Sequence, residues 1–170
     1  MIPTRSQIES YTADHLVDAA DYWGQLAERW EDAHWQVRNQ AHSLVWEGES
    51  GDALRARTAA DYVVATGQAE RLRSASSVAR QQAGELERLH NAVLYAIEDA
   101  EDAGFAVEED LSVADTHASK DLAELAARQT QAQAFAADIR ERAMSLIGGD
   151  GDAAENLTTA AGSLGDVQFS

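Results

Sequence analysis

The sequence predicts an all-α fold, an elongated antiparallel helical hairpin with a third helix packed on the outer half of the second helix. Three observations lead to this class. Apolar residues recur at intervals of three and four over three long stretches, which is the spacing of one helix face. The 170 residues include 1 proline, and the apolar content of 45% is dominated by alanine, the strongest helix former. Glycines separate the stretches, so we expect the chain to reverse direction there.

The first predicted helix covers residues 12–46. A short helical turn is expected before it, because Ser6-x-x-Glu9 has the spacing of a capping box. Its apolar positions form one continuous seam whose single polar member is a histidine. The seam consists of Leu16, Ala20, Trp23, Ala27, Trp30, His34, Val37, Ala41 and Leu44.

The second predicted helix covers residues 51–103, and a polar connector follows it. Gly104 suits the left-handed position that closes many helices. Within the connector we expect Phe105, Val107 and Leu111 to anchor the chain to the bundle. The apolar seam of this helix consists of Leu54, Val63, Val64, Leu72, Ala75, Ala79, Leu86, Leu89, Val93, Ala96 and Ala100.

The turn at residues 48–51 sets the register of the first two helices. Folding back at this point places Trp35 level with Tyr62, and Trp30 level with Gly67. A glycine in the middle of a helix costs about 1 kcal/mol relative to alanine. We therefore expect Gly67 to make room for an indole ring.

The third predicted helix covers residues 115–147 and completes one bundle domain, residues 1–147. We expect its N-cap at Ser112 or Asp115, because both side chains can accept from the first backbone N–H groups. Residues 148–170 open with two glycines and show no apolar period. Such a composition predicts a flexible tail or linker. The seam consists of Ala118, Leu122, Leu125, Gln129, Ala132, Ala136, Ile139, Ala143 and Leu146.

Charge and composition exclude several classes of partner. A formal net charge of −17 disfavours nucleic acid and anionic membrane surfaces, because both repel an acidic protein. No apolar run approaches the roughly 18 residues of a membrane span. The first residues lack a basic start followed by an apolar stretch, so we expect no secretory signal peptide. The absence of cysteine leaves the redox compartment open.

Two short motifs lie at the ends of the second predicted helix. Trp46, Glu47 and Gly48 form a Trp-x-Gly motif at the expected turn, and Tyr95 precedes Asp99 by four residues at the outer end. A Trp-x-Gly at the tip of an acidic, cysteine-free helical hairpin resembles the WXG family of type VII (ESX) secretion substrates. The segment after Asp99 and the added third helix resemble longer mycobacterial members of that family.

The resemblance implies a function and a route. Members are exported without a cleaved signal peptide, and their signal includes a tyrosine followed four positions later by an acid. Trp46 and Gly48 would then contact a partner or the export machinery, and Tyr95 with Asp99 would complete the signal. The protein would be cytoplasmic before export and secreted or in the cell envelope afterwards. The alternative is a cytoplasmic acidic coiled-coil adaptor or chaperone-like binding protein.

The oligomeric state is left open between two arrangements. On one continuous helix, Trp46 and Tyr95 are about 70 Å apart. A composite signal therefore requires an antiparallel partner, either a second copy of the chain or a related helical hairpin. In the other arrangement, the third helix covers the apolar face of the second and the protein is a monomer.

Catalysis is not expected from this sequence. The pairs Glu31/His34 and Glu87/His90 have the helical spacing used by di-iron and di-manganese bundles. In the expected register the two histidines are separated by about 39 Å along the bundle, so they cannot share a metal. We expect a seam or boundary position for His34 and a surface position for His90. The sequence thus predicts no enzyme, no catalytic or metal-binding residues and no cofactor.

Overall fold

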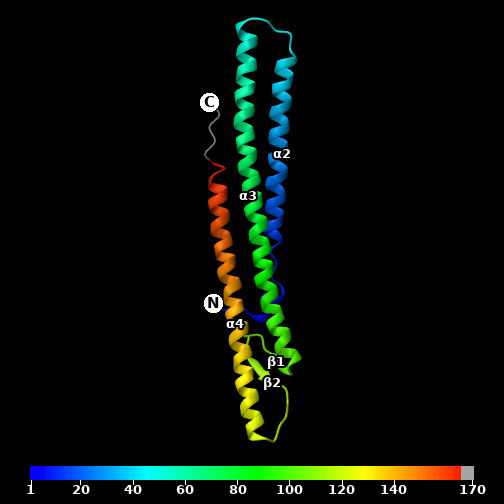
Figure 1. Ribbon diagram of the computed structural model, residues 1–170, viewed down its shortest axis with the longest axis vertical. Coiled ribbons are helices and arrows are strands. Elements are labelled where there is room, and N and C mark those ends of the chain that lie inside the picture. Colours follow the sequence, from blue (N-terminus) through cyan, green and yellow to red (C-terminus); the bar gives the residue numbers. More distant parts are fainter. Residues whose placement is uncertain (166–170) are drawn as a thin grey trace. The chain divides into compact units, whose positions relative to one another are not determined.

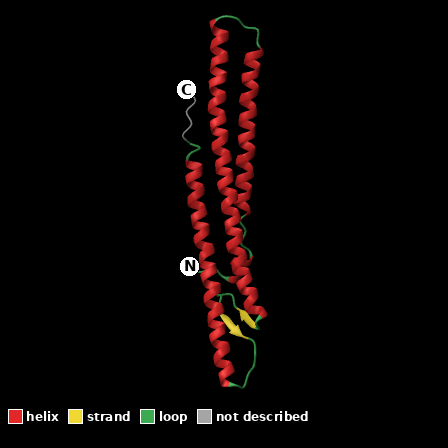
Figure 2. Cartoon of the chain, viewed as in Figure 1, coloured by secondary structure: helices red, strands yellow, loops and turns green. Residues whose placement is uncertain are grey.

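The computed structural model describes residues 1–165 and shows an all-α chain, which confirms the expected fold class (Figure 1). A small β-hairpin is its only strand structure among the described residues (Figure 2). In chain order, the elements are α1 Arg5–Glu9, α2 Asp14–Ser43, α3 Glu49–Asp102, β1 Phe105–Val107, β2 Val113–Asp115 and α4 Leu122–Gly162.

The chain forms two compact units, where the sequence predicts one bundle domain. We call the first the strap unit, which consists of Met1–Ala13 and Ala83–Ala153. The second, the hairpin unit, consists of Asp14–Gln82 and Ala154–Ser170. Because both long helices α3 and α4 run through the division, each unit contains a part of both.

The hairpin unit contains α2 and the first part of α3, which run antiparallel (Figure 2). Their register is the one expected from the sequence. Trp35 and Tyr62 line one surface pocket, and the Arg38 guanidinium lies 5.1 Å from the centre of the Tyr62 ring. Further along, Arg80 pairs with Asp21 at 2.6 Å. The core of this unit includes Ala27, Ala69 and Leu72, with Trp23, Leu26 and Leu164 packed against it.

The role expected for Gly67 is wrong. A methyl group added at Gly67 would meet no atom within 4 Å, and the residue is exposed. Trp30 is half-buried and stacks on the ring of His34 at 5.6 Å instead. The register places residues at the same level, but the phase of each helix decides which way they point. Gly67 lies on the outer face of α3.

The short leading helix α1 is present, but its capping box is not at Ser6 and Glu9. Thr4 is the N-cap, and its side chain accepts from the backbone N–H of Gln7 at 3.3 Å. The side chain of Gln7 accepts in turn from the backbone N–H of Thr4 at 2.9 Å. This reciprocal pair satisfies two backbone donors. Glu9 instead pairs with Arg5 at 2.7 Å.

The connector after α3 folds into the β-hairpin of β1 and β2. Its antiparallel register pairs Phe105 with Asp115 and Val107 with Val113. Phe105, Val107 and Leu111 are 3%, 6% and 0% exposed, so these three residues anchor the connector as expected. The hairpin itself was not expected, because three-residue strands leave too little alternation to be seen in a sequence.

Arg128 of α4 ties the connector to the end of α3. Its Nε donates to both carboxylate oxygens of Asp115 at 2.8 Å. Its Nη2 donates to the backbone oxygens of Ala103 and Gly104 at 3.3 and 3.2 Å. The guanidinium also lies 4.3 Å from the centre of the Phe105 ring. A cation at these terminal carbonyls interacts favourably with the negative end of the helix dipole.

This cluster makes the stability of the strap unit dependent on pH. Hydrogen bonds from Arg128 and from the backbone N–H of His117 hold the pKa of Asp115 below its ordinary value of 3.8. Since the folded pKa is depressed, the charged carboxylate stabilises the fold above pH 3.8, and this contribution is lost as the pH falls through the lowered pKa. We expect Asp115→Asn to be less stable than the wild type near neutral pH.

Unfolding by denaturant at a series of pH values measures this effect. The difference in the free energy of unfolding between the wild type and Asp115→Asn should shrink as the pH falls from about 6 to about 2. A difference that stays constant over this range would show that the charge of Asp115 contributes nothing to the fold.

The boundaries predicted for the third helix are wrong at both ends. The helix α4 begins at Leu122, because Val113–Asp115 is held in the β-ladder and cannot be helical. The N-cap is Asp121, whose carboxylate accepts from the backbone N–H of Ala123 at 2.9 Å, and not Ser112 or Asp115.

The predicted flexible tail is helical over most of its length. The helix α4 continues through Gly148 and Gly149 to Gly162, and Ala153 is 1% exposed. A methyl group at Gly149 would lie 2.6 Å from Leu89 Cδ1, so this glycine allows α4 to approach α3 closely. The end of the predicted tail, residues 166–170, lies outside the described residues.

Candidate interaction sites

The Trp-x-Gly motif lies in the connection between α2 and α3, in the hairpin unit. This connection follows Ser43 and precedes Glu49, so the chain reverses where the sequence predicts. Gly48 has φ +102°, which residues with a side chain rarely adopt. Trp46 is 52% exposed, so about half of the residue is in contact with solvent and it is not buried in a core.

Two further residues hold the backbone of Trp46. Arg55 Nη1 donates to the Trp46 carbonyl at 3.2 Å, and Arg55 Nη2 pairs with Asp52 at 2.6 Å. Gly51 faces the same carbonyl, because a methyl group there would lie 2.2 Å from the oxygen. The sequence indicates Gly51 only as part of the turn and gives no sign of the role of Arg55. A glycine inside the first turn of α3 is the signal that could have identified this close approach.

The tip presents a short run of exposed apolar side chains. Leu44, Val45 and Trp46 are 52%, 97% and 52% exposed. Glu47 and Glu49 follow them and are also exposed. An apolar patch rimmed by charged residues is typical of a protein interaction surface.

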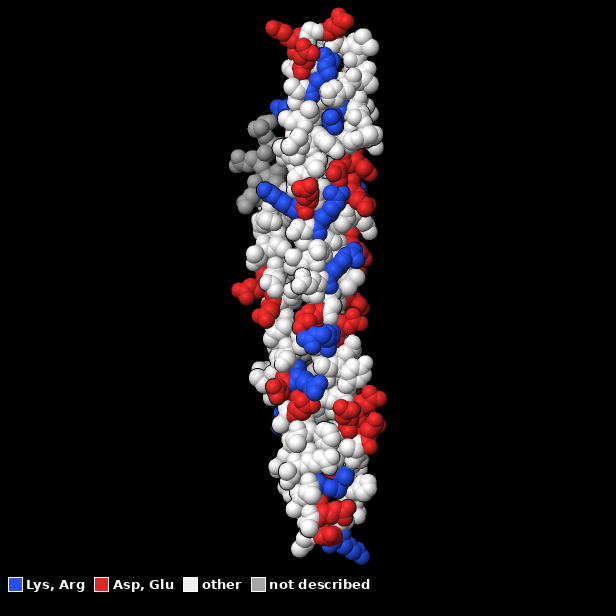
Figure 3. Space-filling view, viewed as in Figure 1, with Lys and Arg blue, Asp and Glu red and all other residues white. Residues whose placement is uncertain are grey.

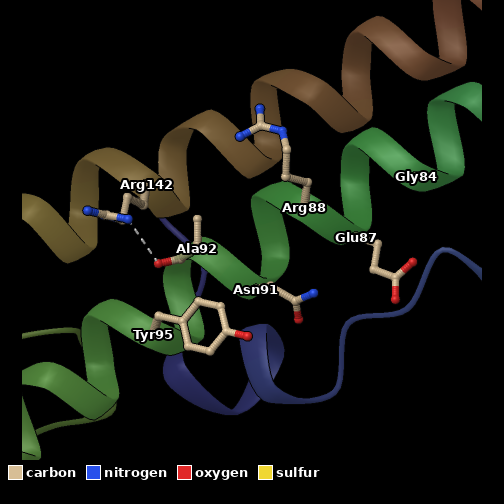
Figure 4. A pocket seen from close by; sticks show the side chains of 7 residues that line it. All are labelled: Gly84, Glu87, Arg88, Asn91, Ala92, Tyr95 and Arg142. Atoms are coloured by element: carbon tan, nitrogen blue, oxygen red, sulfur yellow. Dashed lines mark hydrogen bonds between the residues drawn. The ribbon is translucent and has the colours of Figure 1, made fainter.

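The Tyr-x-x-x-Asp motif lies on α3 in the strap unit. Tyr95 is 62% exposed, and Asp99 is exposed one turn further on the same face. Tyr95 lines a shallow groove of about 520 Å³ with Arg88 of α3 and Arg142 of α4 (Figure 4). The tyrosine ring is thus accessible to a partner.

Ion pairs within each helix arrange the arginines of this groove. Arg142 Nε donates to both oxygens of Asp138 at 3.0 Å, and Arg142 Nη1 donates to the Ala92 carbonyl at 3.4 Å (Figure 4). Arg88 pairs with Glu85 at 2.6 Å and holds the pKa of that carboxyl below its ordinary value. The groove beside the exposed phenol is therefore edged by arginines whose charges are already paired with acidic side chains.

The two motifs belong to different compact units. Trp46 and Gly48 are in the hairpin unit, whereas Tyr95 and Asp99 are in the strap unit. Neither unit brings the two motifs together. Each motif is a separate exposed element, and a partner that reads both must contact both units.

The two Glu-x-x-His pairs have structural partners. His34 Nδ1 donates to the Trp30 carbonyl at 2.8 Å, and the ring is half-buried as expected. His90 is half-buried as well, so the expected surface position is wrong. Its Nε2 donates to the Ile8 carbonyl at 2.7 Å, because the N-terminal segment covers it. Within residues 1–165, no group of three or more His, Cys, Asp or Glu is placed to hold a metal ion.

The surface combines both signs of charge. On the face drawn in Figure 3, Lys and Arg side chains are interspersed with Asp and Glu side chains. None of the helices within residues 1–165 has an apolar stretch of the length and hydropathy that a membrane span requires.

Comparison with known proteins identifies mycobacterial relatives. The chain is 47% identical over 169 residues to "Uncharacterized protein Rv2077c" of Mycobacterium tuberculosis and to "Uncharacterized protein Mb2102c" of Mycobacterium bovis. Each match covers 99% of this chain and 52% of the relative. The chain thus spans about half the length of the curated relatives it matches. No family model and no solved structure matches the chain.

Proposed function

We propose that this chain is a type VII secretion substrate or targeting module that acts through binding and not through catalysis. The observation that carries the proposal is the half-exposed indole of Trp46 at a chain reversal closed by Gly48. Burying an aromatic side chain is favourable, so an indole left half-exposed at a tip is suited to contact with another protein.

Two other observations support the proposal. Tyr95 and Asp99 are exposed on one face of α3, as a signal read by a partner requires. The relatives come from mycobacteria, in agreement with the resemblance to longer mycobacterial WXG proteins. The chain would be cytoplasmic before export and secreted or in the cell envelope afterwards. Its partners would be the export machinery and a second helical hairpin, either another copy or a related protein.

The test is an export assay in a mycobacterial host. We expect Trp46→Ala and Tyr95→Ala each to reduce the amount of protein in the culture filtrate by at least about tenfold, as expected for loss of a hot-spot aromatic residue. The amount in the lysate should stay the same or rise. Immunoblots of filtrate and lysate measure both quantities.

The chain offers matched controls for both variants. Trp35→Ala removes an indole that is 51% exposed in the same unit as Trp46, and Tyr22→Ala removes a phenol that is 61% exposed. Both control variants should be exported like the wild type. Normal export of Trp46→Ala and Tyr95→Ala would refute a role for Trp46 and Tyr95 in export, and absence of the wild type from the culture filtrate would favour the cytoplasmic acidic adaptor. Equal loss in all four variants would refute the specific role of the two motifs.

A further inference from the structure

The N-terminal segment, residues 1–13, forms a fixed strap across α3 and α4 in the strap unit. His90 of α3 donates to the Ile8 carbonyl at 2.7 Å, and its ring lies 5.5 Å from that of Tyr11. The Tyr11 hydroxyl donates to Asp150 Oδ1 of α4 at 2.9 Å. Ile8 is 1% exposed, so the strap has its own buried anchor.

A pocket of about 300 Å³ lies between the strap and α4. Its apolar walls come from Pro3 and Ile8 of the strap and from Leu146 and Ile147 of α4. Its polar lining consists of Gln7, Tyr11 and Asp150. Pockets that bury drug-sized ligands have volumes of about 300–1,000 Å³. This pocket lies at the lower limit of that range, so it suits a single side chain or a molecule of that size.

Among the described residues, Asp150 is the only charged one that lines this pocket. Among residues 1–165, no Lys or Arg forms an ion pair with it, and α4 has no Lys or Arg between Arg142 and its end at Gly162. Burial and the hydrogen bond to Asp150 raise the pKa of Tyr11 above its ordinary value of 10. The phenol therefore stays neutral and donates, and the negative charge of the pocket resides on the carboxylate.

We propose that this pocket binds the side chain of a lysine presented by a partner protein. The four-carbon stem would lie against Ile8, Leu146 and Ile147, and the ammonium would reach the carboxylate of Asp150. Because Tyr11 already occupies Oδ1, the carboxylate offers its other oxygen, which suits the point charge of an ammonium better than the paired donors of a guanidinium. The strong negative charge of the chain, −17, also attracts a basic partner.

This site is distinct from Trp46 and from Tyr95, so the proposal does not depend on export. Neither Trp46 nor Tyr95 lines the pocket. A partner that inserts a lysine would fasten the strap and α4 together, since the walls of the pocket come from both. The inference therefore adds a second class of contact to the chain.

The experiment titrates the whole chain with n-pentylammonium chloride as the probe. Methyl resonances of Ile8, Leu146 and Ile147 in carbon–proton correlation spectra report on the pocket. We expect saturable shifts with a Kd on the order of millimolar, as befits so small a ligand. Pentan-1-ol and sodium hexanoate have the same pentyl stem with a neutral and an anionic head, and should bind at least tenfold more weakly.

Asp150→Asn removes the charge but keeps an oxygen that can accept from Tyr11. This variant should weaken pentylammonium binding at least tenfold and leave the spectrum of the free protein otherwise unchanged. Asp152→Asn is the matched control, because Asp152 is an exposed acid of the same helix that does not line the pocket. Equal shifts from all three probes, equal binding by Asp150→Asn and the wild type, or no shift of the pocket methyls would each overturn the proposal.

Discussion

Replacing Leu111 by alanine should lower the free energy of unfolding of the strap unit by about 2–5 kcal/mol, as is typical of a fully buried leucine. Leu111 is 0% exposed in the turn between β1 and β2. It also has φ 63°, which costs a residue with a side chain about 1 kcal/mol or slightly more. The fold accepts this cost because burial of the side chain contributes more. Its backbone N–H donates to the Glu108 carbonyl at 3.0 Å, which fixes the turn.

Denaturant unfolding followed by far-UV circular dichroism measures this loss. Leu122→Ala is the matched control, because Leu122 is 82% exposed at the start of α4. The control should change the free energy of unfolding by no more than about 0.5 kcal/mol. If Leu111→Ala costs no more than Leu122→Ala, the connector does not anchor the strap unit.

Replacing Gly51 by alanine should destabilise the hairpin unit by about 1–3 kcal/mol, the range for overpacked sites. The new methyl group would lie 2.2 Å from the carbonyl oxygen and 3.0 Å from the carbonyl carbon of Trp46. Both are backbone atoms, so no rotation of a side chain can relieve the overlap. The connection between α2 and α3 must move, and the hydrogen bond from Arg55 to this carbonyl is lost.

Tryptophan fluorescence during unfolding reports on this unit, because all 4 tryptophans lie within Asp14–Gln82. The indole proton resonance of Trp46 should also shift in Gly51→Ala. Gly67→Ala is the matched control, since a methyl group there meets no atom within 4 Å. The control should gain up to about 1 kcal/mol, the difference in helix propensity. A Gly51→Ala protein as stable as Gly67→Ala would contradict the close approach.

The reversal at Gly48 and the register of Trp35 with Tyr62 were predictable. A long apolar period on each side of a glycine-containing break leaves one way to bury both seams, which is an antiparallel hairpin. The exposure of Trp46 was also predictable, because the tip of a helical hairpin has few neighbours that could bury a ring. The exposure of Tyr95 was not predictable, because the helix α4 packs beside this part of α3. The residues that hold the Trp46 backbone, Gly51 and Arg55, were not predictable, because they act on a carbonyl group that has no sequence signal.

The predicted end of the third helix at residue 147 was wrong, because a pair of glycines can either end a helix or allow close packing within one. Gly148 and Gly149 predict the end of a helix, since glycine commonly follows the last turn. In the structure, Gly149 removes a side chain where α4 meets Leu86 and Leu89 of α3. A sequence shows the lack of a side chain in both cases, and only the neighbouring helix distinguishes them.

By itself, the sequence determined the all-α class, the hairpin of α2 and α3 and the position of its turn, because helix periodicity and glycine breaks are local properties of the chain. Tertiary structure alone decided the division into two units, the β-hairpin, the length of α4 and the strap over His90. Those features depend on contacts between residues far apart in the chain, such as Tyr11 with Asp150 and Arg128 with Asp115. Their free energy comes from packing and pairing that no local pattern encodes.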